Sequence, residues 1–158
     1  MLRRTITAKL FAEEFTVQDT IINQGFNDED VALCYHCNFG YPLVREGAKM
    51  INVPADIAEI PAPIHGFEEQ CIDVKHTGDV ATAGIENGEI GAYITYERKT
   101  LPDFLVWKMM GESEYVVGLE PITTSLGGQD IIDNKKFVSL KPFEEYKTNL
   151  KFSFKELK

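Results

Sequence analysis

One histidine stands where a side chain could move protons. His36 ends the largely apolar run 31–36 and opens the loop 38–48. A side chain at the junction of a regular element and a loop is well placed to face a cleft. Imidazole changes its charge near neutral pH, which suits it to give or take a proton. The alternative is a structural histidine that bonds the loop backbone.

One glutamate lies in a segment that should be buried. Glu120 follows the apolar residues of Tyr115-Val116-Val117-Gly118-Leu119 and is followed at once by Pro121. Burying a carboxylate is costly unless it is paired or its pKa rises. A raised pKa is what makes a glutamate a useful general base near neutrality. The alternative is a glutamate at a strand end whose side chain turns to water.

The cysteines do not form a convincing metal site. Cys34 and Cys37 have zinc-ligand spacing, but such a site normally uses two pairs, and only Cys71 remains. The other histidines, His65 and His76, are far away in the sequence. On a strand, Cys34 and Cys37 would also point to opposite faces. We therefore expect no metal and interpret Cys34 as a core-packing residue.

Aromatic residues offer candidate surfaces for a sugar ring. Trp107 lies between Leu105 and Met109 on a predicted strand, and Tyr35 and Tyr41 stand on either side of His36 in the sequence. Aromatic faces stack on sugars, but a single tryptophan is more often part of a core. The Gly-rich loop 125–130 lacks the spacing of a phosphate-binding loop.

The elements that must position these residues are strands. Period-two alternation recurs along the chain, and Asn87-Gly88 is a strong hairpin signal. In the first predicted strand, Phe15, Val17 and Ile21 share one face, and Asp19 breaks that pattern. We predict an all-β fold, an antiparallel β-sandwich or barrel. The predicted strands are 13–21, 31–36 (buried on both faces), 70–76, 80–86, 89–98, 104–109, 115–120, 137–140 and 146–157.

The last predicted strand needs a cover for one of its faces. Leu150, Phe152 and Phe154 alternate with polar residues, so one face of the strand is apolar and the other faces solvent. In so short a chain the cover could be incomplete, and uncovered faces and edges invite association.

Composition and charge limit the class of protein. The chain has 158 residues, 16 Lys and Arg against 25 Asp and Glu, a formal net charge of −9 and three cysteines. This acidic balance argues against nucleic acid and anionic lipid as partners. No apolar run approaches the ~18 residues of a membrane span, and the first residues lack the core of a secretory signal. We expect one soluble, cytoplasmic domain over 1–158 that uses no cofactor.

Two motifs together resemble a known family. The segment His36-Cys37-Asn38-Phe39-Gly40-Tyr41-Pro42-Leu43 is similar to the H-x-N-F-G-Y-P-L stretch of an uncharacterised branch of the aldose 1-epimerase (galactose mutarotase-like) superfamily. Leu101-Pro102, Trp107-Lys108 and 115–121 resemble a later segment of that branch, in the same order. The resemblance implies a β-supersandwich with a sugar-binding cleft on its concave sheet.

The resemblance also implies roles for particular residues. His36 would act as general acid on the ring oxygen of a sugar, and Glu120 would take the proton of the anomeric hydroxyl. Opening a hemiacetal needs these two proton transfers and neither metal nor nucleotide. The candidate substrate-binding residues are Asn38, Tyr41, Trp107 and His65. A third polar site residue falls between the motifs, where His65, Glu68 and Glu69 are candidates.

The resemblance covers only the C-terminal part of the longer relatives. In the superfamily, an Arg and a further His that hold the sugar come from the N-terminal part, and nothing matches Arg3 or Arg4 to that role. We therefore expect either a sugar anomer-interconverting enzyme or a non-catalytic, carbohydrate-binding or structural sandwich. In the second case the chain would form a homodimer or pair with an N-terminal half.

Overall fold

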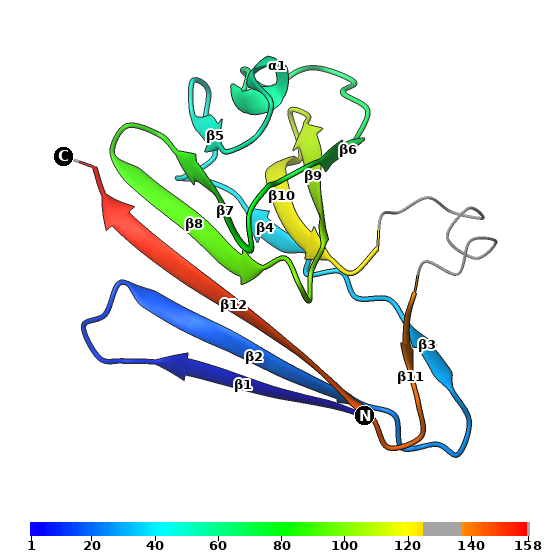
Figure 1. Cartoon of the computed structure of the whole chain (residues 1–158). Coiled ribbons are helices and arrows are strands. Elements are labelled where there is room, and N and C mark those ends of the chain that lie inside the picture. Colours follow the sequence, from blue (N-terminus) through cyan, green and yellow to red (C-terminus); the bar gives the residue numbers. More distant parts are fainter. Residues whose placement is uncertain (125–136, 158) are drawn as a thin grey trace.

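Strands make up most of the structure, a computed structural model that describes residues 1–124 and 137–157 (Figure 1). The predicted Gly-rich loop 125–130 lies outside these residues. The helix α1 is four residues long, and no helix of the described residues is long and apolar enough to cross a bilayer. The elements are β1 (Leu2–Ala8), β2 (Glu14–Ile22), β3 (Glu29–Val31), β4 (Cys37–Phe39), β5 (Lys49–Ile51), α1 (Ala55–Ala58), β6 (Gln70–Val74), β7 (Val80–Glu86), β8 (Ile90–Glu97), β9 (Asp103–Met110), β10 (Tyr115–Ile122), β11 (Val138–Leu140) and β12 (Glu145–Glu156).

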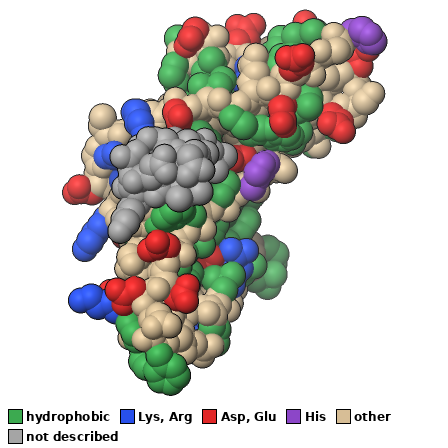
Figure 2. Space-filling view, turned by 90° about the vertical axis from the view of Figure 1, so that its right-hand side faces the viewer, with side chains coloured by type: hydrophobic (Ala, Val, Ile, Leu, Met, Phe, Trp, Pro, Cys, Tyr) green, Lys and Arg blue, Asp and Glu red, His purple; other side chains and the backbone are tan. Residues whose placement is uncertain are grey.

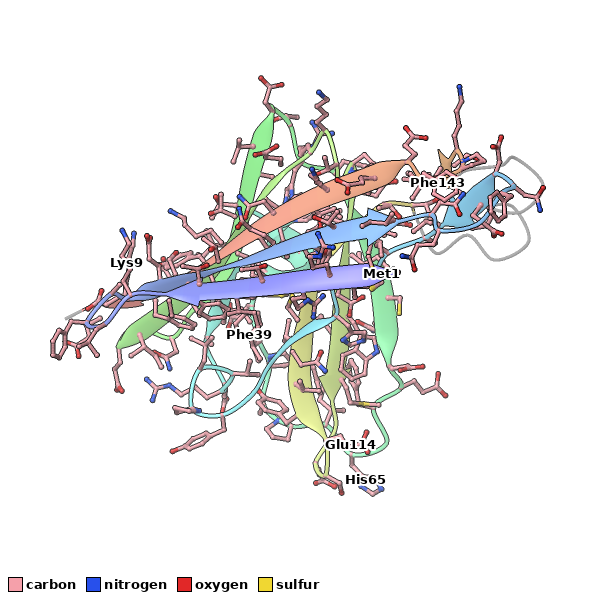
Figure 3. All side chains as sticks on the ribbon, turned by 90° about the horizontal axis from the view of Figure 1, so that it is seen from below. Met1, Lys9, Phe39, His65, Glu114 and Phe143 are labelled. Carbon is pink, nitrogen blue, oxygen red and sulfur yellow. The ribbon has the colours of Figure 1, made fainter. Side chains whose placement is uncertain are left out.

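Two antiparallel sheets form the fold, which confirms the predicted all-β sandwich. The larger sheet has six strands in the order β1-β2-β12-β8-β7-β5, and the smaller has four in the order β4-β10-β9-β6. β3 and β11 form a separate two-stranded ribbon. In Figure 3, β1, β2 and β12 cross β9 and β10 at a steep angle, as in sandwiches with crossed sheets.

The core between the sheets fixes which side chains of β10 point outward. Val117 and Leu119 are fully buried and belong to the same core cluster as Val106 of β9 and Ile94 of β8. Because successive side chains of a strand point to opposite faces, the next residue along, Glu120, lies on the outer face of the four-stranded sheet. The site is built on this outer face.

The segment before β4 differs from its prediction. The run 31–36 was expected to be one strand buried on both faces, but β3 ends at Val31 and Cys34 makes only an isolated bridge, to Ile122. The chain changes partner here, from β11 to the edge of the four-stranded sheet. Only Tyr35 of this run is buried, while Cys34 and His36 are exposed. The strand β4 falls instead at the start of the predicted loop.

A buried polar network anchors this irregular segment. Arg4 donates to Asp19 through Nε at 2.8 Å and Nη2 at 2.7 Å, and the Tyr35 hydroxyl donates to Oδ2 of Asp19 at 2.7 Å. The Tyr35 hydroxyl also bonds the hydroxyl of Thr148 on β12. The hydrogen bonds from Arg4 and Tyr35 hold the pKa of Asp19 below its ordinary value, against the effect of burial. Tyr35, the neighbour of His36, is thereby tied to three strands.

Part of the larger sheet has no cover within the described residues. Cross-strand pairing puts Leu2 and Ile6 of β1 on the same face as Phe15 of β2 and Phe152 and Phe154 of β12. We call these five side chains the uncovered face: Leu2, Ile6 and Phe154 are 55%, 63% and 43% exposed. The ring of Phe15 stacks with the rings of Phe152 and Phe154. The prediction of an apolar face on the last strand is confirmed, and the described residues cover this face only in part.

An apolar hollow continues the uncovered face towards β4. It has a volume of about 350 Å³ and is lined mainly by Phe39, Leu43, Ile90, Ala92 and Phe154. Figure 2, which faces the opposite ends of β2, β8 and β12 from this hollow, shows the molecule narrowing between its upper part, which holds α1, and its lower part, which holds β1 and β2.

Candidate functional site

The fold brings His36 and Glu120 into contact. Cys37 pairs with Leu119 across β4 and β10, so the residue before Cys37 lies beside Glu120. The Nε2 atom of His36 is 3.0 Å from Oε1 of Glu120. Two residues that are remote in the sequence are thus neighbours on the outer face of the four-stranded sheet.

The carboxylate of Glu120 is buried. The residue is 2% exposed, and its Oε2 accepts a hydrogen bond from the Cys34 thiol at 3.4 Å. Burial raises the pKa of Glu120, while the charge of His36 and the bond from Cys34 act in the opposite direction. Among the described residues, no donor is aligned for a hydrogen bond to Oε1, although Nε2 of His36 is within ion-pair distance. Oε2 of this buried carboxylate is therefore held by a hydrogen bond, and Oε1 can accept a proton.

The imidazole of His36 has a fixed orientation and an open side. Its Nδ1 lies 2.8 Å from Oδ1 of Asn38, and its side chain is 49% exposed. Because an amide oxygen can only accept, Nδ1 carries a proton in this arrangement. Nε2 is then the nitrogen that faces Glu120 and can exchange a proton.

A glycine makes room for the carboxylate. Gly118 pairs with Asn38 on one side and with Trp107 on the other. A Cβ at position 118 would lie 2.5 Å from Oε1 of Glu120 and 3.2 Å from Cβ of Trp107. The missing side chain is what allows Glu120 to fold back over its own strand between Asn38 and Trp107.

Trp107 forms one wall of the site. Its ring stands edge-on to the ring of His36, with centroids 5.4 Å apart. Its Nε1 donates to Oε2 of Glu69, just before β6, at 2.9 Å. Glu69 was one of three candidates for a third polar site residue, and the structure places it at the site through Trp107. The sequence signal for it was only its position between the two motifs.

The two other candidate binding residues lie apart from this group. Tyr41 is 86% exposed in the loop after β4. His65 pairs with Glu112 at 2.8 Å by the turn between β9 and β10, at the opposite end of β10 from Glu120 (Figure 3). The site as described therefore consists of His36, Glu120, Asn38, Trp107 and Glu69, with Cys34 and Gly118 supporting Glu120.

Cys34 was wrongly expected to pack in the core. It is exposed and bonds Glu120, whereas Cys37 is half-buried and donates to the carbonyl oxygen of Tyr35 at 3.3 Å. Partial desolvation of its sulfur, together with the charge of Glu120, raises the pKa of Cys34 to about 12, and burial raises the pKa of Cys37 to about 12. No group of three or more His, Cys, Asp or Glu side chains in residues 1–124 and 137–157 could hold a metal ion.

Solved structures share this fold over nearly the whole chain. A Klebsiella pneumoniae subsp. pneumoniae MGH 78578 protein provisionally described as an aldose 1-epimerase is 20% identical with a TM-score of 0.90, over 99% of this chain and 47% of its own. A galactose mutarotase-like protein from Clostridium acetobutylicum is 16% identical with a TM-score of 0.63, over 91% and 53%. A galactose mutarotase related enzyme from Lactobacillus acidophilus is 11% identical with a TM-score of 0.68, over 99% and 62%.

These likenesses establish a galactose mutarotase-like fold. The chain spans about half the length of the solved structures that it matches. A comparison with curated proteins found no match. Residues 1–154 match the family described as a domain of unknown function, DUF4432, and the chain belongs to that family.

Proposed function

We propose that this protein interconverts the anomers of a sugar by general acid–base catalysis, with His36 as the acid and Glu120 as the base. The observation that carries the proposal is the contact of 3.0 Å between a buried carboxylate and a half-exposed imidazole. Paired titratable groups in contrasting environments are the usual basis for dividing the roles of acid and base. The mutarotase-like fold supports the same chemistry.

The geometry suits the two ends of a hemiacetal. Ring opening requires a proton to leave the anomeric hydroxyl and a proton to reach the ring oxygen. No donor in the described part of the chain is aligned with Oε1 of Glu120, so this oxygen can take the first proton. In its doubly protonated form, His36 can deliver the second proton from Nε2, because Nδ1 keeps the proton that it donates to Asn38. Rotation about the opened carbon–carbon bond and reversal of both transfers then close the other anomer.

The residues around the pair suit a sugar as ligand. Trp107 offers an aromatic ring beside His36, and Asn38 and Glu69 offer polar groups for hydroxyls. Sugar sites combine such ring surfaces with a few fixed polar groups. The three cysteines are free, as is usual in a reducing compartment, and we place the protein in the cytoplasm.

Saturation-transfer NMR on free hexoses tests the proposal directly. With D-glucose, D-galactose or a hexose 6-phosphate as probe, we expect the exchange between α and β anomers to rise above its rate in buffer for at least one sugar. If the resonances of the protein shift with a sugar while the exchange rate stays at the buffer value, the protein binds sugar without catalysing this reaction.

The uncovered face favours a second candidate function. Its exposed apolar side chains, together with the hollow of about 350 Å³, form a surface that soluble monomers usually bury. In this alternative the chain is a non-catalytic, carbohydrate-binding or structural sandwich that forms a homodimer or pairs with an N-terminal half.

Light scattering across a range of protein concentrations separates these arrangements. A homodimer built on the uncovered face should show twice the mass of the chain, and Ile6→Glu should return it to a monomer because the charge would be buried unpaired. A monomer at every concentration rules out the homodimer and leaves a different chain as the cover.

A further inference from the structure

The thiol of Cys34 touches the proposed base. Its Sγ lies 3.4 Å from Oε2 of Glu120. The backbone on both sides of Cys34 is tied to the end of β10, because Leu33 bonds Thr123 and Tyr35 donates to the carbonyl oxygen of Pro121. Cys34 itself makes a bridge with Ile122. The position of the thiol is therefore set by the strand that carries Glu120.

We propose that Cys34 is a positioning residue whose thiol holds Oε2 of Glu120, so that Oε1 is the oxygen presented to His36 and to substrate. The proposal rests on the proposed function, in which Glu120 is the base. A carboxylate held at one oxygen cannot rotate freely, and fixed geometry is what proton transfer requires. Gly118 provides the space for this orientation, since a Cβ there would meet Oε1.

The thiol acts as a donor and not as a nucleophile. Burial and the charge of Glu120 raise the pKa of Cys34 to about 12, so the thiol keeps its proton near neutral pH. A thiolate would repel the carboxylate, whereas a thiol stabilises its charged form. Within residues 1–124 and 137–157, the titratable groups that interact with Glu120 are His36, Cys34, Cys37 and Cys71, and of these four His36 alone can bring positive charge.

The substitutions Cys34→Ala and Cys34→Ser test the role of this thiol in catalysis. Cys34→Ala removes the donor, so the pKa of Glu120 should rise and the acidic limb of the profile of kcat/KM against pH should move to higher pH. We expect kcat at pH 6 to fall about three- to tenfold with little change in KM. Cys34→Ser keeps a donor and should stay near the wild type. The comparison variant is Cys71→Ala, because this exposed thiol of β6 interacts with Glu120 through charge and not through a hydrogen bond. Equal profiles for Cys34→Ala and Cys71→Ala would overturn the proposal.

Alkylation of Cys34 tests the contact without any sugar. Glu120→Gln removes the negative charge beside the thiol, so Cys34 should ionise at lower pH. Mass spectrometry of the iodoacetamide-treated protein at pH 8 should show faster modification at Cys34 than in the wild type, with a smaller gain at Cys71. An unchanged rate at Cys34 would overturn the contact. Faster alkylation in a protein that catalyses no anomer exchange would sink the proposed function and leave the contact in place.

Discussion

Replacing Glu120 with glutamine should lower the rate of anomer exchange by about a hundred- to ten-thousand-fold, the usual contribution of one general base. Glutamine has nearly the same shape, so it can occupy the same space over Gly118, but its amide cannot take a proton. Saturation-transfer NMR gives the exchange rate, and a thermal melt of the same sample checks that the fold is retained.

The chain contains a matched control for this substitution. Glu112 pairs with His65 at 2.8 Å, but both side chains are exposed, at 61% and 92%. Glu112→Gln removes the same charge from the same type of pair and should leave exchange at the wild-type rate. Exchange that survives unchanged in Glu120→Gln would show that Glu120 is not the base.

The pH profile gives a further readout of the same substitution. Burial raises the pKa of Glu120, so the fraction of carboxylate falls as the pH drops towards this raised value. The exchange rate of the wild type should therefore decline on the acidic side at a higher pH than an ordinary glutamate would give. The small residual rate of Glu120→Gln should lack this limb.

The Asp19→Ala substitution should destabilise the fold by about 2–3 kcal/mol, because it removes the centre of a buried hydrogen-bond network. Asp19 is 3% exposed and accepts three hydrogen bonds, from Arg4 and Tyr35. Its loss leaves the Tyr35 hydroxyl with Thr148 as its partner and removes the hydrogen bonds that tie the Arg4 side chain to β2. Urea titration monitored by circular dichroism measures the free energy of unfolding.

An exposed ion pair serves as the control for Asp19. Lys75 and Asp103 are also 2.7 Å apart, but the lysine is 69% exposed. Asp103→Ala should cost less than about 1 kcal/mol, as expected for a solvated pair. Similar losses for Asp19→Ala and Asp103→Ala would show that the buried network adds nothing special.

Low pH should remove the contribution of Asp19 to the stability of the fold. The folded-state pKa of Asp19 is lowered, so its contribution is present above the ordinary aspartate value of about 4 and is lost as the pH falls through the folded-state value. The gap in stability between the wild type and Asp19→Ala should therefore close below about pH 4. A gap that stays constant down to pH 2 would contradict the assigned cause.

The sequence predicted the strands that build the core better than the segments at its edge. β7 begins and ends where the alternation predicts, and the Asn87-Gly88 turn is present, with Gly88 at φ 83°. β1 was missed because all seven of its residues are exposed, so it lacks the pattern of a half-buried strand. The partner change after Val31 was missed because it depends on the distant strands β10 and β11.

The sequence named His36, Glu120, Asn38 and Trp107, which the structure brings together, but also Tyr41 and His65, which lie apart from them. The apolar neighbours of Glu120 left two alternatives, a buried carboxylate or one turned to water, and the structure has it buried at 2% exposure. The contacts of Asn38, Gly118 and Trp107 follow from the register of β4, β10 and β9, which no local pattern specifies. Cys34 was assigned to the core because its run looks apolar, yet only the pairing with the end of β10 decides its direction.

The place of β12 in the larger sheet has a consequence for biosynthesis. β12 lies between β2 and β8, so it joins strands that are made long before it. Until residues 145–156 have left the ribosome, β2 and β8 each keep an unpaired edge. Between the synthesis of β8 and that of β12, the nascent chain therefore carries two separate half-sheets, and each has a free edge that another chain could pair with.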